Sequence, residues 1–359
     1  MTALSLRSIK PLHYLLLALP VAILGSLLHW NPLFNFVVAC AGLIPLAELI
    51  GEATEQLAVF TGPKIGGLLN ATLGNAAELI ITLVAIRAGL LDLVKASITG
   101  SIIGNLLLVM GASLLFGGLR HGTQTFHRGH AATNSTLLVL AVLALCVPSI
   151  FNHTSTGLAL PTRTVESISL GVAGVMIVLY ALGLIYSLRS AGTALAPAGA
   201  EAAAPHWSRR TALIVLALAT LAVVWLSEIL VESVEPVTAA LGLSEFFLGI
   251  ILIPIIGNVA EHLVAVEVSL KNKMDLSLEI ALGSSLQIAL FVAPVLVFAS
   301  LLFGHELNLV FNQFELLALI GAVAISALVA SDGETNWLEG AQLLGVYIIL
   351  GVAFFFIPG

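Results

Sequence analysis

The sequence predicts an all-α polytopic membrane protein of about 11 transmembrane helices, with an extra first helix followed by two inverted-topology five-helix repeats. The composition, the recurring apolar runs and an internal repeat predict this fold. Of the 359 residues, 59% are hydrophobic and only 9% are charged, and the mean hydropathy is +1.10. An ordinary soluble domain carries about 25% charged residues, so most of this chain is not expected to face water.

Apolar runs of about 20 residues recur along the chain, and each can cross a hydrocarbon core of ~30 Å as an α-helix. Runs such as LLLALPVAIL do not alternate apolar and polar residues, which argues against a transmembrane β-barrel. The predicted spans lie near residues 12–30, 34–60, 63–88, 94–118, 131–150, 166–188, 210–234, 243–270, 275–303, 312–331 and 338–357.

We expect the chain to divide into four segments. The first apolar run lacks a small-residue cleavage site, so we expect it to be retained as a span rather than removed as a signal peptide. A stretch rich in Ala, Pro and Gly separates the two halves. The segments are residues 1–33 (N-terminal segment and first helix), 34–188 (repeat 1, helices 2–6), 189–209 (cytoplasmic connector) and 210–359 (repeat 2, helices 7–11).

The basic residues predict the orientation. With the N-terminus in the cytoplasm, ten of the 13 Lys and Arg residues fall at cytoplasmic ends of spans, in line with the positive-inside rule. The far side then holds Arg87, Lys95 and Arg163. An odd number of spans places the C-terminus outside, and we expect an integral protein of the cell (inner) membrane.

A polar motif occurs twice. GNAAE at Gly74–Glu78 recurs as GNVAE at Gly257–Glu261, and LAELIGEATE at 46–55 recurs as LSEILVESVE at 226–235. Chance alignment of apolar segments would not pair these polar residues at equal spacing. Because each repeat has an odd number of spans, the second copy enters the membrane from the opposite side, an arrangement typical of secondary transporters.

Glu78 and Glu261 are expected to form one site. A carboxylate at the centre of a bilayer costs about 2.5–3.5 kcal/mol, which a hydrogen-bonded packing role explains less readily for a symmetry-related pair than for one residue. A pseudo-two-fold axis brings equivalent positions together near the midplane, so we expect both glutamates to hold a cation or protons there. Two carboxylates suit a hard divalent metal such as Ca²⁺, which takes about 6–8 oxygen ligands. No Cys/His cluster suggests zinc.

Further groups near these glutamates are expected to line the site. Gly74 and Gly257 would let a helix break and free backbone carbonyls, although close helix packing is the alternative. The side chains of the polar group could supply oxygens, or could serve only in hydrogen bonds between helices. The polar group comprises Asn75, Asn258, Ser101, Asn105, Ser284 and Gln287.

Two acidic triplets repeat at the spacing i, i+4, i+7, which places three acids on one face of each helix. We expect them to form vestibule walls or moving gates that concentrate cations. A solvated position at a span end explains the last acid of each triplet equally well. The triplets are Glu48, Glu52 and Glu55, and Glu228, Glu232 and Glu235.

These motifs resemble a known family. GNAAELI and GNVAEHL, each followed by a Gly-Ser helix (TGSIIGNLLLVMG and LGSSLQIALFVAP), resemble the two signature repeats of the Ca²⁺/H⁺ exchanger (CAX) family of the Ca²⁺/cation antiporter superfamily. PLAELIGEATEQLA and SDGETNWLEGAQLL resemble further segments of that family. Many members join their halves by a long acidic segment, whereas the connector here contains only Glu201 as an acid.

The resemblance implies a secondary transporter rather than an enzyme, with no cofactor and with Ca²⁺ as transported substrate. It implies that Ca²⁺ exchanges for H⁺ by alternating access, with Glu78 and Glu261 as the essential acids. An empty, doubly charged site would be costly in lipid, so metal or protons must neutralise it before it reorients. The expected partners are Ca²⁺, H⁺ and the lipid bilayer, without nucleic acid; a homo-oligomer is compatible with the sequence.

Other functions remain open at this stage. A Na⁺(K⁺)/H⁺ antiporter or a Na⁺/Ca²⁺ exchanger could use the same scaffold, although one carboxylate would suffice for a monovalent ion. A channel would not require an inverted repeat with acids at the midplane. An intramembrane protease would be expected to use aspartates. The role of His262, which follows Glu261 where the first repeat has Leu79, also stays open.

Overall fold

The computed structural model describes residues 11–154, 162–189 and 206–357. The N-terminal basic residues Arg7 and Lys10, and most of the predicted connector with Glu201, lie outside the described residues.

The first half of the chain is helical except for one short strand. A 3₁₀-helix, Pro11–Leu17, leads into α1 (Ala18–Leu27). The remaining elements are α2 (Pro32–Leu73), α3 (Ala76–Arg87), α4 (Leu91–Ile103), the π-helical turn η3 (Gly104–Val109), α5 (Met110–His121), β1 (Gln124–Thr125), α6 (Arg128–Thr154) and α7 (Thr162–Arg189).

The second half is likewise helical except for one short strand. Its elements are α8 (Arg209–Leu241), α9 (Glu245–Phe247), the π-helical turn η4 (Leu248–Leu252), α10 (Ile253–Leu270), α11 (Met274–Gln287), the π-helical turn η5 (Ile288–Val292), α12 (Ala293–Phe303), α13 (Gln313–Val329), β2 (Glu334–Thr335) and α14 (Trp337–Phe355).

The predicted all-α membrane fold is confirmed. Within the described ranges, eight helices are long and apolar enough to cross a membrane, or nine if the bent pair Ile65–Leu73 and Ala76–Arg87 is one span. Two shorter apolar helices, Leu12–Leu27 and Gln313–Val329, occupy the places of the first and tenth predicted spans. The count of 11 therefore stays a prediction.

Local chemistry sets several helix boundaries. The long α2 is interrupted at Gly62, whose φ of 82° is a conformation that only glycine adopts without strain. The N-cap of α13 is Asn312, whose side chain accepts from the backbone N–H of Glu315, and the Glu315 carboxylate accepts from the Asn312 N–H in return. Such a capping box satisfies two backbone donors that would otherwise be unpaired.

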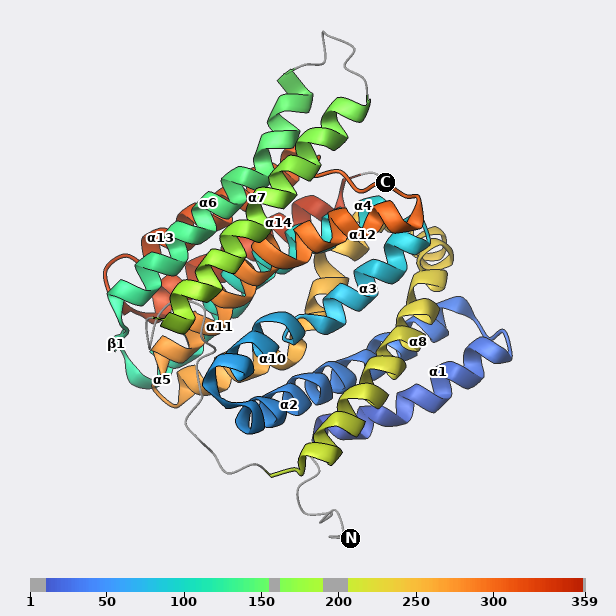
Figure 1. The fold of residues 1–359 in the computed structure, drawn as a ribbon, viewed down its shortest axis with the longest axis horizontal. Coiled ribbons are helices and arrows are strands. Elements are labelled where there is room, and N and C mark those ends of the chain that lie inside the picture. The colour runs from blue at the N-terminus through green and yellow to red at the C-terminus, as the bar shows by residue number, and fades with distance from the viewer. Residues whose placement is uncertain (1–10, 155–161, 190–205, 358–359) are drawn as a thin grey trace.

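The two halves pack closely against each other. α2 contacts α8, its counterpart in the second repeat, and α4 contacts η4. At the second crossing a Cβ on Gly100 would collide with the backbone carbonyl of Ile250, so only glycine permits this approach. In Figure 1, α1, α2 and α8 lie together along one side of the molecule, away from the α6–α7 pair.

A two-residue ribbon also joins the halves. β1 and β2 pair antiparallel, with Gln124 opposite Thr335 and Thr125 opposite Glu334. The sequence pattern did not predict these strands. The Gln124 amide further donates to the Ser269 carbonyl and to Asn272, so the ribbon also ties down the loop between α10 and α11.

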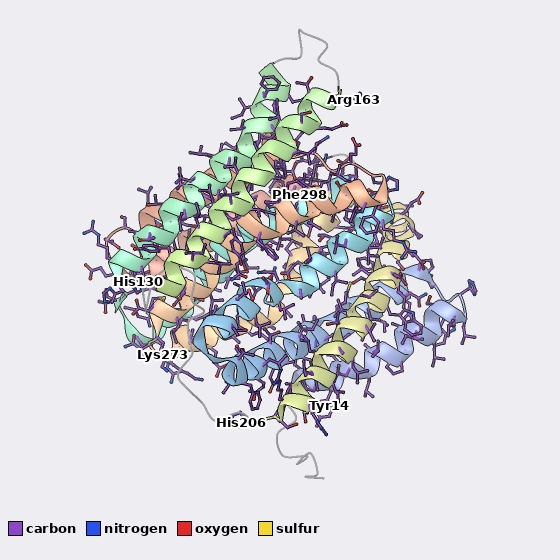
Figure 2. All side chains as sticks on the ribbon, in the orientation of Figure 1. Tyr14, His130, Arg163, His206, Lys273 and Phe298 are labelled. Carbon is purple, nitrogen blue, oxygen red and sulfur yellow. The ribbon has the colours of Figure 1, made fainter. Side chains whose placement is uncertain are left out.

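The molecule has two distinguishable ends. The backbone N–H of His206, where the chain re-enters the described residues, donates to Gln56 Oε1 of α2, and we call this the connector end. Figure 2 shows Lys273 and His206 toward one end and Arg163 at the far tip of the α6–α7 pair. This separation agrees with their predicted opposite faces. Which face is cytoplasmic stays a prediction.

Candidate cation site

Glu78 lies in the first turn of α3, directly after a helix break, and its exposed fraction is 3%. Gly74 and Asn75 separate α2 from α3, and the two helical segments meet at 43°. The positive end of the α3 dipole therefore lies beside the Glu78 carboxyl.

The two repeats differ at this break. We expected the Gly-Asn pair to open the helix in each copy, and this holds only for the first. In the second, Gly257 and Asn258 lie inside the continuous helix α10, where Asn258 Nδ2 donates to the Pro254 carbonyl at 3.2 Å. The two copies of the motif are thus similar in sequence but differ in backbone conformation.

The two glutamates are brought together by reciprocal packing. A Cβ on Gly257 would lie 3.0 Å from Glu78 Cγ, and a Cβ on Gly74 would lie 3.8 Å from Glu261 Oε1. Glu78 therefore packs tightly on Gly257, whereas Glu261 approaches Gly74 at ordinary van der Waals distance, with Gln287 Oε1 nearer at 3.6 Å. The Glu78 carboxyl is also within electrostatic reach of Glu261. The predicted juxtaposition is present.

Each carboxyl has one buried oxygen without a hydrogen-bond partner among the described residues: Glu78 Oε1 and Glu261 Oε2. Asn258 lies beside Glu78, and Ser284 lies beside Glu261. Buried polar atoms in proteins are normally satisfied, so a proton, a cation or a water molecule would be expected at each of these two oxygens.

A buried chain of hydrogen bonds runs between the repeats next to these carboxyls. Asn105 Nδ2 donates to Ser284 Oγ at 3.0 Å, and Ser284 Oγ donates to Asn75 Oδ1 at 3.2 Å. Asn75 Nδ2 in turn donates to Gln287 Oε1 at 2.6 Å. These hydrogen bonds join helices of the two repeats. Hydrogen bonding between helices is the alternative role that the sequence left open for these residues. Ser101 is buried on α4 and takes no part in them.

Sequence reasoning missed the π-helical turns that flank this chain. Asn105 lies within η3, and Gln287 directly precedes η5. Such turns are frequent at functional sites because they displace side chains from the regular helical spacing. Nothing in the apolar sequences GNLLLV and IALFV signals them.

The two acidic triplets differ in the side chains that lie near them. Glu48 lies 3.7 Å from His13 Nε2, and its counterpart Glu228 lies 3.3 Å from Arg87 Nη1. Glu55 is exposed near the connector end and is within electrostatic reach of Glu261. Its counterpart Glu235 instead faces Glu245.

The remaining two triplet members, Glu52 and Glu232, are half-buried and exposed respectively. One member of the first triplet, Glu55, therefore comes within electrostatic reach of the paired glutamates.

Another acid was not anticipated. Glu315 is 3% exposed, accepts from Thr99 Oγ1 at 3.2 Å, and helps to line a cavity of about 800 Å³ with Asp92, Lys95 and Glu245. Its place three residues after Asn312 is the sequence signal for a helix cap, and the cap bonds account for part of its hydrogen bonding.

The metal-binding chemistry of the site is limited to oxygen donors. Among residues 11–154, 162–189 and 206–357, no group of three or more His, Cys, Asp or Glu side chains could hold a metal ion. Two carboxylates with neighbouring amide and hydroxyl groups match the preference of a hard cation for oxygen. His262 follows Glu261, and its Nε2 has no hydrogen-bond partner among the described residues.

Comparison with known proteins places the chain among ion exchangers. The family described as "Sodium/calcium exchanger protein" matches residues 32–189 and again residues 211–356. The chain is 46% identical over 360 residues to a Ca²⁺/H⁺ antiporter of Aphanothece halophytica, covering 96% of each protein. It is 44% identical to the Ca²⁺/H⁺ antiporter ChaA of Bacillus subtilis, covering 94% of this chain and 96% of the relative.

Solved structures agree. The structure of native YfkE is 41% identical, has a TM-score of 0.84, and is matched over 96% of this chain and 100% of its own. The crystal structure of the H⁺/Ca²⁺ exchanger CAX, at 15% identity and a TM-score of 0.73, shows the shared fold alone. The resemblance seen in the motifs is confirmed, and the chain belongs to the sodium/calcium exchanger protein family, among relatives named as Ca²⁺/H⁺ antiporters.

Proposed function

We propose that this protein is a secondary antiporter that exchanges Ca²⁺ for H⁺ through one site shared by Glu78 and Glu261. The observation that carries the proposal is the reciprocal packing of these glutamates over Gly257 and Gly74, with one unpartnered oxygen on each carboxyl. The relatives named as Ca²⁺/H⁺ antiporters support the choice of ions.

The burial of the site couples the two fluxes. With Ca²⁺ bound, both carboxylates are ionised and their charge is neutralised by the metal. Without Ca²⁺, two adjacent charges in a buried setting are costly, so protons must take its place. Because the empty charged site does not reorient, a cation moves one way only when protons move the other.

Access to the site alternates between the two faces in this proposal. Both carboxyls have a buried oxygen, and Glu55 comes within electrostatic reach of Glu261 from the connector end. We assign the connector end to the cytoplasm of a cell-membrane protein. Protons moving inward would then drive Ca²⁺ outward.

Proton-driven ⁴⁵Ca²⁺ uptake into everted vesicles tests the shared site. Glu78→Gln and Glu261→Gln keep the side-chain shape but remove the charge, so each is expected to abolish uptake. Glu267→Gln is the matched control, because Glu267 lies on α10 in an exposed ion pair with Lys271. Wild-type uptake by either site variant would overturn the shared-site proposal.

The driving ion is tested with the same vesicles. Uptake is expected when a pH gradient is the sole driving force, and no uptake is expected from a Na⁺ gradient at equal pH. If Ca²⁺ uptake followed the Na⁺ gradient instead, the protein would be a Na⁺/Ca²⁺ exchanger, and the proposed exchange for H⁺ would be wrong.

A further inference from the structure

A tyrosine outside the motifs contacts the helix break in the first repeat. Tyr180 of α7 is 4% exposed, and its Oη donates to the backbone carbonyl of Ala71 at 2.7 Å. Its ring stacks on Phe291 of η5, with centroids 5.1 Å apart and planes at 24°. Ala71 lies in the last turn of α2, four residues before Asn75.

The second repeat shows what happens without such a contact. Pro254 occupies the position of Ala71, four residues before Asn258. There the Asn258 side chain itself donates to the Pro254 carbonyl, and α10 runs on without interruption. A carbonyl four residues upstream is the usual local acceptor for a short polar side chain on a helix.

In the first repeat this local acceptor is taken by the Tyr180 hydroxyl. The Asn75 side chain is directed away from its own helix, donating to Gln287 and accepting from Ser284 of the other repeat. The same residue type, at the same place in the repeat, thus bonds locally in one copy and across the repeat interface in the other.

We infer that Tyr180 is a positioning residue that holds the first repeat open at Gly74–Asn75 and directs the Asn75 amide across to Gln287, beside the Glu78 and Glu261 carboxyls. Tyr180 would act through Asn75 and not through direct contact with either glutamate. The inference rests on the proposed function, because the consequence of a misplaced Asn75 is measured as weaker binding of the transported cation.

Tyr180→Phe tests the inference, since phenylalanine keeps the stacked ring and removes only the hydroxyl. Asn75 Nδ2 would then turn to the Ala71 carbonyl and leave Gln287. We expect the KM for Ca²⁺ and the Kd of the purified protein to rise roughly three- to tenfold, the range for one buried hydrogen bond. Tyr186→Phe is the matched control, because Tyr186 lies on the same helix and is 56% exposed.

A double-mutant cycle separates positioning from general destabilisation. If Tyr180 acts through Asn75, adding Tyr180→Phe to Asn75→Ala should leave the Kd for Ca²⁺ unchanged. The melting temperature of Tyr180→Phe should stay close to that of Tyr186→Phe.

Two results would overturn the inference: a Kd for Tyr180→Phe equal to that of wild type, or an equal further loss in the Asn75→Ala background. In either case, proton-driven uptake by the wild-type protein would leave the proposed function standing. Absence of wild-type uptake would instead count against the proposed function.

Discussion

Glu78 lies against Gly257 of the opposite repeat so closely that a Cβ on that glycine would be 3.0 Å from Glu78 Cγ and 3.4 Å from its Oε1. The carboxyl of one half is therefore positioned by the smallest residue of the other. In the proposed site, the glycines of the two GN motifs would therefore matter through packing, although they contribute no ligand side chain.

Gly257→Ala is expected to weaken Ca²⁺ binding about tenfold, because overpacking of this kind costs roughly 1–3 kcal/mol and would shift the Glu78 carboxyl. Isothermal titration of purified protein measures the change in Kd. Gly283→Ala on α11 is the control, since a Cβ there meets nothing within 4 Å. Equal affinities for the two variants would contradict the packing account.

Glu55→Gln is expected to raise the KM for Ca²⁺ about two- to fivefold at low ionic strength, with the difference fading near 0.5 M salt. The reason is that Glu55 adds negative charge next to Glu261 from the connector end. The control is Glu235→Gln at the equivalent position, where the neighbour is Glu245. Initial uptake rates across a salt series give the comparison, and a salt-independent effect would argue against electrostatic attraction.

Gly100→Ala is expected to destabilise the fold by about 3 kcal/mol or more, because the added methyl group would collide with the Ile250 backbone carbonyl, which cannot move aside as a side chain could. Thermal unfolding in detergent measures this as a lower midpoint. Gly171→Ala, on α7 with open space around it, should unfold at or above the wild-type temperature. The prediction fails if both variants unfold together.

Arg87→Gln is expected to change stability by no more than about 1 kcal/mol, since its ion pair with Glu228 is solvent-exposed on both sides. The thermal midpoint should therefore match that of the wild-type protein. A drop of many degrees would show that this pair, which links α3 to α8, is far stronger than surface ion pairs usually are.

The parts of the site that could be predicted are the residues that occur in both copies of the sequence repeat. The meeting of Glu78 and Glu261 follows from copying a buried acid and inverting the copy, which needs only the sequence and the physics of the bilayer. The all-α membrane fold likewise follows from apolar length, whereas the count of 11 spans stays a prediction.

The asymmetric parts could not be predicted. The bend at Asn75 and the straight helix at Asn258 differ because of partners such as Tyr180, which lies about 100 residues away in sequence and in no motif. The π-helical turns beside Asn105 and Gln287, and the electrostatic reach of Glu55 to Glu261, also depend on tertiary packing. Local pattern carries no information about such contacts.

The short ribbon of Gln124–Thr125 and Glu334–Thr335 links helix ends of the two repeats. It fastens the ends of α5, α6, α13 and α14 together, and Gln124 extends the fastening to the loop between α10 and α11. α1, α2 and α8 lie outside this clasp, along one side (Figure 1). In a transport cycle of the proposed kind, the ribbon would thus restrain the helices that it joins, and with them α11, which carries Ser284 and Gln287, more than the helices that bear the acidic triplets.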